Sequence, residues 1–224
     1  PNLFMHQDYE QFVWDAILKS DVKPRGNYVY SDLGFILLRK AIENITQMPF
    51  DSFLNENIYK PLNLSNLTFN PLSKVNADWI VPTEMDTFFR WQLVNGTVHD
   101  QTAAMLGGIS GHAGVFGSAN DVSIIMQMLL DGGEYGGKRI LKESKVNLFT
   151  KKQGKTRRGL GFDKPEMDIK KGTPTSRLCS AATFGHTGFT GTCAWVDPKS
   201  NLVFVFLSTR VNPSSENKKP LALH

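Results

Sequence analysis

The most constraining feature of this sequence is a polar break in an apolar, glycine-punctuated stretch near its C-terminal end. Residues 180–192 read SAATFGHTGFTGT, so the triplet His186-Thr187-Gly188 interrupts the alternation expected of a half-buried strand. The glycines in this stretch leave room for another backbone or a substrate to approach closely. The pattern predicts a strand whose polar edge faces a ligand.

The composition is that of an ordinary globular protein. The chain has 224 residues, of which 41% are hydrophobic and 21% charged, and this length allows a large core. No run approaches the roughly 18 apolar residues of a membrane-spanning helix. The first residues lack the charged and then apolar order of a signal peptide, and the chain does not begin with Met. We expect it to start inside a longer polypeptide.

The net charge of +4 arises largely in residues 151–158, which read KKQGKTRR. A nucleic-acid surface would carry a reading motif or an aromatic platform beside such cations, and neither accompanies them. We therefore expect a solvated basic loop and no nucleic-acid partner. The two cysteines, Cys179 and Cys193, lack the C-x-x-C spacing of a metal site. Two buried free thiols are favoured over a disulfide, which stays open.

The first two thirds of the chain favour helices. Apolar spacing predicts helices over residues 9–19, 33–46, 50–59, 122–130 and 142–149. Ser31 or Asp32 can cap the second of these helices. Its inward positions are expected to be Leu33, Ile36, Leu37, Ala41 and Ile45. Residues 24–27 are expected to turn, residues 60–105 to be rich in loops, and residues 107–114 to form a glycine-dense bend.

Beyond residue 158 the pattern changes to short extended segments. Strands are predicted over residues 159–162, 178–184, 192–196 and 202–208, the last two joined by a turn at residues 197–201. The sequence therefore predicts a single α+β domain over residues 1–224. Residues 1–158 would form a mainly helical lobe, and residues 159–224 would supply the antiparallel strands of the other lobe.

Two polar triplets at opposite ends of the chain fit one site. Tyr30-Ser31-Asp32 stands where an extended segment enters a helix, beside N–H groups that favour negative charge. A tyrosine and the histidine of His186-Thr187-Gly188, facing one pocket, could share proton transfer. Taken singly, a tyrosine before a helix is usually a packing aromatic, and a strand histidine is usually structural. Only the two triplets together suggest chemistry.

The order and spacing of these motifs resemble those of a known superfamily. The two triplets, GHAGVF at residues 111–116 and a capped helix ending in LLDGG resemble the serine β-lactamase and penicillin-binding-protein superfamily, from about Tyr9 to Asn217. The class C-like branch with esterase-type members fits best, in particular the β-lactamase-related domains fused to glycoside hydrolases in Bacteroidetes-type bacteria. The resemblance implies a two-lobe α+β fold, incomplete here at the N-terminus, with no cofactor and no metal.

The superfamily's catalytic motifs are Ser-x-x-Lys, Tyr-x-Asn and Lys-Thr-Gly. By the resemblance, Tyr30 is the base or proton relay. Asp32 stands where Asn is usual, which changes an amide donor into a carboxylate in the substrate-binding site. His186 stands for the lysine of the third motif, a substitution frequent among esterase-like relatives, and is the second catalytic side chain.

The remaining implied site residues follow His186. Thr187 and Gly188 match the family motif directly and, with Thr190, would line the substrate-binding wall. The backbone N–H of Phe189 would contribute to an oxyanion hole, an electrostatic effect often worth a few kcal/mol.

The nucleophile is the missing part. Ser20-Asp21-Val22-Lys23 fits Ser-x-x-Lys as a pattern, but Pro24 directly after Lys23 disfavours the helix that the motif requires. We reject this match and expect the true motif upstream of Pro1. The chain alone is therefore expected to be inactive.

The implied reaction is acyl transfer. A serine would attack the carbonyl of a β-lactam, a peptidoglycan-type peptide or a small ester, and water would release the acyl group. The departures at Asp32 and His186 keep a second hypothesis open, a degenerate domain that binds cell-wall peptide or supports a fused glycosidase. The resemblance also implies a periplasmic or extracellular location for the parent polypeptide.

Other candidate residues have simpler interpretations. Gly108-Ile109-Ser110-Gly111 narrowly misses the Gly-x-Ser-x-Gly nucleophile elbow, because His112 follows and no strand precedes it. His112 is expected to fix the glycine bend. His99-Asp100 could be a metal pair, but a loop hydrogen bond is favoured. Trp91 is expected in the core.

Overall fold

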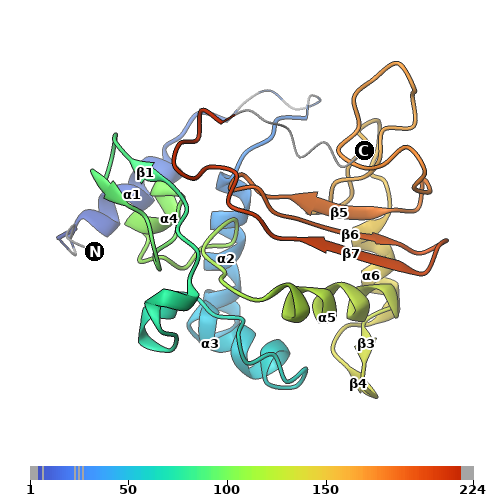
Figure 1. Ribbon diagram of the computed structural model, residues 1–224, viewed down its shortest axis with the longest axis horizontal. Helices are drawn as coiled ribbons and strands as arrows, with labels where there is room; N and C mark the ends of the chain where they lie inside the picture. The colour runs from blue at the N-terminus through green and yellow to red at the C-terminus, as the bar shows by residue number, and fades with distance from the viewer. Residues whose placement is uncertain (1–4, 7, 23, 25, 27, 218–224) are drawn as a thin grey trace. The chain divides into compact units, whose positions relative to one another are not determined.

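The computed structural model describes residues 5–217, except residues 7, 23, 25 and 27. Its chain divides into two compact units that alternate along the sequence (Figure 1). Unit 1 comprises residues 1–55, 68–116 and 212–214, and unit 2 comprises residues 56–67, 117–211 and 215–224. No described helix is long and apolar enough to cross a membrane. Residues 25 and 27 of the turn predicted at residues 24–27, and Lys23 of the rejected motif, lie outside the described residues.

Unit 1 begins with two helices that share a small core. Helices α1 (Tyr9–Leu18) and α2 (Leu33–Thr46) have nearly the predicted bounds. They pack through Ile17 and Ile36, together with Leu106. Leu37, Ala41 and Ile45 are exposed, Ile45 to 82%, so their predicted inward positions are wrong. Only the face of α2 that carries Ile36 packs on this core, and the buried stripe is narrower than the sequence suggested.

The remainder of unit 1 contains short elements that the sequence did not all predict. They are α3 (Phe50–Leu54), η2 (Pro71–Ser73), η3 (Ala77–Trp79), β1 (Met85–Asp86), β2 (Gln92–Leu93) and α4 (Gln101–Met105). After α3 the chain continues into a π-helical turn, η1 (Asn55–Tyr59), of which all but Asn55 belongs to unit 2. Strands β1 and β2 pair in an antiparallel hairpin. Trp91 lies next to this hairpin with a φ of 54° and is 76% exposed, so its predicted core position is wrong.

Unit 2 is built on the antiparallel meander expected from the sequence. Strands β5 (Phe184–Thr187), β6 (Cys193–Asp197) and β7 (Leu202–Phe206) lie side by side in that order (Figure 1). The strand predicted over residues 159–162 is wrong, and of the strand predicted over residues 178–184 only Phe184 is extended, as the first residue of β5. In the second segment, the Ser180 amide and hydroxyl both bind the Asp197 carboxylate, which favours a turn over a strand. Cys179 and Cys193 are both free, and only Cys193 is buried.

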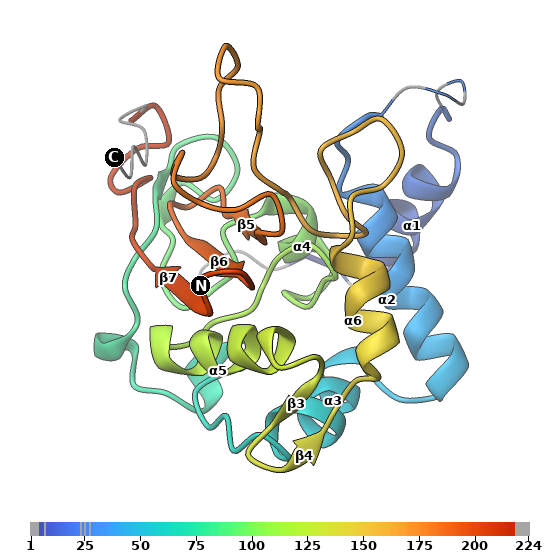
Figure 2. The ribbon, with the colours of Figure 1, turned by 90° about the vertical axis from the view of Figure 1, so that its right-hand side faces the viewer.

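Helix α5 covers one face of this sheet. It spans Ala119–Leu130 and begins at Ser118, whose hydroxyl accepts the Asp121 amide at 3.2 Å. In Figure 2 the helix runs along this sheet. Its Met126 packs against Phe184 and Val196. The expected division at residue 158 separates helices from strands, whereas the compact units group α5, the β3–β4 hairpin and α6 with the strands. These last elements span Glu134–Tyr135, Lys138–Arg139 and Glu143–Thr150.

The outer strand β7 presents an apolar row. Leu202, Phe204 and Phe206 alternate along it and are 53%, 39% and 37% exposed, while the intervening valines face α5. Of the described strands, β7 pairs only with β6, so it forms one edge of this sheet.

Candidate active site

The His186-Thr187-Gly188 segment in unit 2 ends strand β5 and enters a tight turn. The Gly188 amide donates to the Thr192 carbonyl at 2.6 Å, and the Gly191 amide donates to the Gly188 carbonyl at 3.1 Å. A Cβ on Gly188 would lie 2.2 Å from Oγ1 of Thr192. The close approach predicted at this glycine is therefore made by the protein's own turn.

The ring of His186 is held at both nitrogens. Nη1 of Arg158 lies 3.0 Å from Nε2, and the Thr187 carbonyl lies 2.6 Å from Nδ1. A guanidinium can only donate, so Nε2 accepts and the proton is on Nδ1, from which it is donated to the carbonyl. The ring is thus a neutral acceptor in this arrangement, and the positive charge on the wall belongs to Arg158.

A buried carboxylate positions that arginine. Asp163, 3% exposed, accepts hydrogen bonds from Nε and Nη2 of Arg157 at 2.8 and 2.9 Å and forms an ion pair with Nη2 of Arg158 at 3.3 Å. Burial acts to raise the pKa of Asp163, but the hydrogen bonds from Arg157 and the Lys164 amide and the two guanidinium charges outweigh it and lower that pKa. Asp163 thus contacts both arginines, and Arg158 brings its guanidinium beside His186.

The fully solvated basic loop predicted over residues 151–158 is therefore wrong at its end. Lys151, Lys152 and Lys155 are exposed as expected, but Arg157 and Arg158 are half-buried. The reason is a long-range contact: Asp163 pairs with the strand residue Gly185 and brings its carboxylate to these arginines. No local pattern in the sequence signals this pairing.

A second arginine contact that the sequence did not predict holds the turn after β5. Nη2 of Arg210 donates to the Phe189 carbonyl at 2.6 Å, and the guanidinium lies 5.4 Å from the Phe189 ring centre. The Asn217 side-chain amide donates to the Arg210 carbonyl at 3.0 Å. The carbonyl of the predicted oxyanion-hole residue is thus fixed, and Thr190 lies half-buried in the same turn.

In unit 1, the Tyr30-Ser31-Asp32 corner leads into α2 as predicted. Tyr30 is 59% exposed. The Ser31 hydroxyl accepts the Leu33 amide at 3.3 Å, whereas Asp32, at the N-cap position, makes no capping hydrogen bond with its side chain. The Asp32 carboxylate instead lies with the side chains of Asp100 and His112, with one ligand-type atom of each within 4.8 Å of the others.

His112 links the glycine bend to helix α4. Its Nε2 lies 2.9 Å from Oδ1 of Asp100, and its Nδ1 lies 2.9 Å from Oγ of Ser110. Asp100 also caps α4 by accepting the Ala103 amide at 2.7 Å. Burial acts to raise the pKa of Asp100, but the hydrogen bonds from His112 and Ala103 outweigh it and lower that pKa. The prediction that His112 fixes the bend is confirmed, and His99 pairs with Glu84 at 2.6 Å instead of sharing a metal with Asp100.

The Ser110, His112 and Asp100 side chains are connected in the order of a Ser-His-Asp triad. Ser110 is only 3% exposed, however, so a substrate carbonyl has no access to its hydroxyl. This serine therefore tethers the bend, consistent with our rejection of the nucleophile elbow. Ser20 is no better placed, since it follows α1 and its hydroxyl donates back to the Ile17 carbonyl at 2.7 Å.

The Asp32, Asp100 and His112 cluster also has the residue types of a cation site, with two carboxylates and an imidazole. Nε2 of His112 carries a hydrogen that it donates to Asp100. In this arrangement Nε2 has no lone pair to offer a metal. The absence of a metal stays a prediction.

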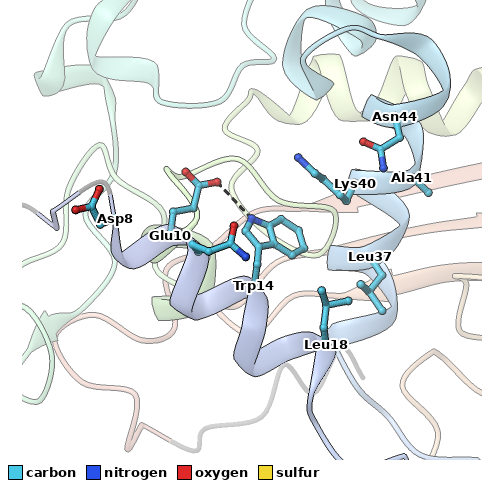
Figure 3. A pocket seen from close by; sticks show the side chains of 9 residues that line it. Asp8, Glu10, Trp14, Leu18, Leu37, Lys40, Ala41 and Asn44 are labelled. Carbon is cyan, nitrogen blue, oxygen red and sulfur yellow. Dashed lines mark hydrogen bonds between the residues drawn. The ribbon is translucent and has the colours of Figure 1, made fainter.

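A groove of about 770 Å³ lies between α1 and α2 in unit 1 (Figure 3). Trp14 forms its floor, donating to Glu10 at 3.3 Å and lying 5.7 Å from the Lys40 ammonium. Neither Tyr30 nor Asp32 lines it. The site residues predicted in unit 1 are therefore not part of this groove.

The helices of unit 1 and the meander of unit 2 define an α+β domain with one polar motif in each unit. The chain matches the family described as Beta-lactamase over residues 4–224 and belongs to this β-lactamase and penicillin-binding-protein family of serine hydrolases. The α+β, β-lactamase-like fold expected from the sequence is confirmed.

The similar proteins are longer than this chain. A Salmonella gallinarum protein named "Putative D-alanyl-D-alanine carboxypeptidase" is 35% identical over 213 residues, which cover 89% of this chain and 49% of that protein. A Salmonella agona protein of the same name gives the same values. The chain therefore spans about half the length of the curated relatives it matches.

Solved structures share the fold. A penicillin-binding-protein homologue from Caulobacter crescentus aligns with a TM-score of 0.61 at 20% identity, over 88% of this chain and 58% of that one. Simvastatin synthase from Aspergillus terreus aligns with a TM-score of 0.62 at 16% identity, over 91% and 55% of the two chains. At these identities the likeness concerns the fold alone.

Tyr30 lies in unit 1, and His186 with Thr187, Gly188 and Phe189 lies in unit 2. Within its unit, each motif has the local setting that the sequence led us to expect. Their meeting in one catalytic site stays a prediction.

Proposed function

We propose that the polypeptide carrying this chain is a serine carboxypeptidase that removes the last residue from peptides ending in D-alanyl-D-alanine. A serine supplied from outside this chain attacks the penultimate carbonyl and forms an ester. The peptide bond breaks, Tyr30 passes the serine's proton to the leaving amine, and water then hydrolyses the ester. Such peptides belong to the cell wall, so we also propose a periplasmic or extracellular location.

One observation carries this proposal: the guanidinium of Arg158 lies 3.0 Å from His186, held by the buried Asp163. A carboxypeptidase substrate ends in a free carboxylate, and guanidinium groups bind carboxylates through parallel charge-assisted hydrogen bonds. In this chain the neutral His186 orients the arginine, and the arginine supplies the charge. The name of the Salmonella relatives, D-alanyl-D-alanine carboxypeptidase, independently supports this substrate class.

The other site residues receive matching roles. Phe189 donates its backbone N–H to the developing oxyanion, and the Arg210 contact to the Phe189 carbonyl keeps that peptide oriented. Thr187 and Thr190 line the wall beside the terminal residue of the substrate.

The test compares two substrates in the complete polypeptide: diacetyl-L-lysyl-D-alanyl-D-alanine and its C-terminal amide. Free D-alanine and D-alaninamide are quantified by chromatography. We expect the free acid to be preferred. Arg158→Ala should lower kcat/KM for the acid about ten- to a hundredfold, the value of a hydrogen bond to a charged group, and leave the amide unchanged. Lys155→Ala removes the same charge from an exposed site in the same segment and should change neither rate.

Other outcomes would reject the proposal. Equal rates for the acid and the amide would mean that Arg158 does not bind the substrate carboxylate. Turnover of a chromogenic cephalosporin or a p-nitrophenyl ester without D-alanine release would indicate a lactamase or esterase. Peptide binding without any turnover would favour the degenerate binding domain.

A further inference from the structure

The hydrogen-bonded series Ser110, His112 and Asp100 has no accessible nucleophile, but it ends beside Asp32, a residue of the predicted site. Asp32 is the third residue of the Tyr30-Ser31-Asp32 motif, and its carboxylate lies within 4.8 Å of the Asp100 and His112 polar atoms. Its backbone carbonyl accepts the first two helical amides that bond in α2, those of Phe35 and Ile36, at 2.9 and 3.1 Å. Whatever fixes Asp32 therefore also fixes the start of this helix.

The glycine bend that carries His112 is attached directly to α2. A Cβ on Gly111 would lie 2.1 Å from the Phe35 carbonyl oxygen, so the two backbones touch. Nη1 of Arg39, on the next turn of α2, donates to the Ile109 carbonyl at 2.6 Å. The bend and the helix start thus form one packed assembly within unit 1.

Charge explains why a histidine suits this position. Asp32 and Asp100 are both carboxylates, and at this separation they repel each other. The Nε2–H of His112 donates to Asp100 and reduces that repulsion, while Nδ1 is anchored by the buried Ser110. Without the histidine, the Asp32 carboxylate would be pushed away from Asp100, and the backbone that carries Tyr30 would move with it.

We propose that His112 is a positioning residue for the Tyr30-Ser31-Asp32 motif, acting through Asp100 and Asp32. This inference rests on the proposed function in one respect: it takes Tyr30 to be the residue that transfers the proton in the carboxypeptidase reaction. His112 itself does not touch the substrate. Its role is to keep Asp32 and the adjoining Tyr30 in the geometry that the reaction needs.

The kinetic test uses the complete polypeptide and the D-alanine release assay. His112→Ala should lower kcat about ten- to a hundredfold, as expected for a misplaced reacting group, and change KM less than twofold. His112→Gln should recover part of the loss, because its amide can donate to Asp100 in place of Nε2. His112→Asn, whose amide is too short to reach Asp100, should recover less.

A double-mutant cycle separates positioning from general weakening of the fold. If His112 acts through Asp32, the pair Asp32→Asn with His112→Ala should be no slower than Asp32→Asn alone. Lys19→Ala is the matched control, since Lys19 also pairs with a carboxylate in unit 1, that of Asp15, but is outside this cluster. Its effect should simply multiply that of Asp32→Asn. Multiplicative effects for His112→Ala would overturn the proposal.

Hydrogen exchange provides a readout that needs no turnover. Peptides covering residues 30–36 should exchange faster in His112→Ala than in the unchanged polypeptide, whereas Lys19→Ala should leave their exchange rate unchanged. If no D-alanine is released at all, the proposed function fails, and this exchange result still decides the positioning role. Unchanged exchange in His112→Ala would overturn the positioning role. So would an equimolar metal ion bound to the unchanged polypeptide and absent from His112→Ala, because the cluster would then be a cation site.

Discussion

Asp163 and Gly185 exchange two backbone hydrogen bonds, the Asp163 amide donating to the Gly185 carbonyl at 2.7 Å and the Gly185 amide to the Asp163 carbonyl at 3.1 Å. This isolated bridge sets a buried carboxylate beside the residue that precedes His186. The carboxylate forms ion pairs with Arg157 and Arg158, which belong to a segment that the sequence predicts to be solvated. The charge on the His186 side of the sheet is therefore determined by a contact that does not involve His186.

We expect Asp163→Asn to destabilise unit 2. The change removes the buried carboxylate that both guanidinium groups contact, and removing one partner of a buried ion pair costs about 3–5 kcal/mol. Arg157 is partly exposed, so the lower end of that range, about 3 kcal/mol, is expected. Urea unfolding followed by circular dichroism measures the loss. Asp168→Asn, at an exposed site further along the same loop, should be close to neutral.

The pH dependence of stability should report on Asp197. Burial acts to raise its pKa, but hydrogen bonds from Ser180 and from the Lys199 and Ser200 amides lower it from 3.8 to about 2. A carboxyl whose pKa is lower in the folded state stabilises the fold above its unfolded pKa. That contribution is lost as the pH falls from about 4 to about 2. Its size is about 2 kcal/mol, and Asp197→Asn should remove this part of the slope in acid unfolding curves.

Gly111→Ala should destabilise unit 1, because the new methyl group meets the Phe35 carbonyl oxygen at 2.1 Å. Backbone must move to relieve the overlap, and overpacking of this kind costs about 1–3 kcal/mol. Gly172→Ala provides the comparison, since a Cβ there meets nothing within 4 Å. Equal thermal midpoints for the two variants would contradict the close contact between the bend and α2.

The cap of α5 can be measured with two serines of one helix. Ser118→Ala removes the hydroxyl that accepts the Asp121 amide and should cost about 1 kcal/mol. Ser123→Ala removes a hydroxyl that donates to the Ala119 carbonyl, which already has its helical role, and should cost much less. Chemical denaturation of both variants gives the difference, and no difference would show that the Ser118 cap is unimportant.

The sequence predicted best those elements whose cause is local. Helix α2 has the predicted bounds because its apolar spacing lies within it and the Ser31 hydroxyl, just before it, accepts the Leu33 amide. The β6–β7 hairpin follows from alternation and a strong turn at residues 197–201. The strand predicted over residues 178–184 is wrong before Phe184 because a distant carboxylate, Asp197, binds Ser180 and bends the chain.

The same distinction applies to the candidate site. The motif residues could be named from their order along the chain, and His112 was correctly expected to fix the bend. Arg158, Arg210 and Asp100 were not predicted as partners of the site. Each contacts its partner across 12 to 28 residues of sequence, beyond the reach of local periodicity, and only the tertiary contacts reveal them.

The apolar row on β7 has a practical consequence. An edge strand with unpaired backbone groups and exposed Leu202, Phe204 and Phe206 is a template on which another β-strand can add. When this chain is produced by itself, copies should associate edge to edge as their concentration rises. Light scattering should then grow with protein concentration, and Phe204→Lys should suppress that growth. This result would show that the isolated chain self-associates through β7.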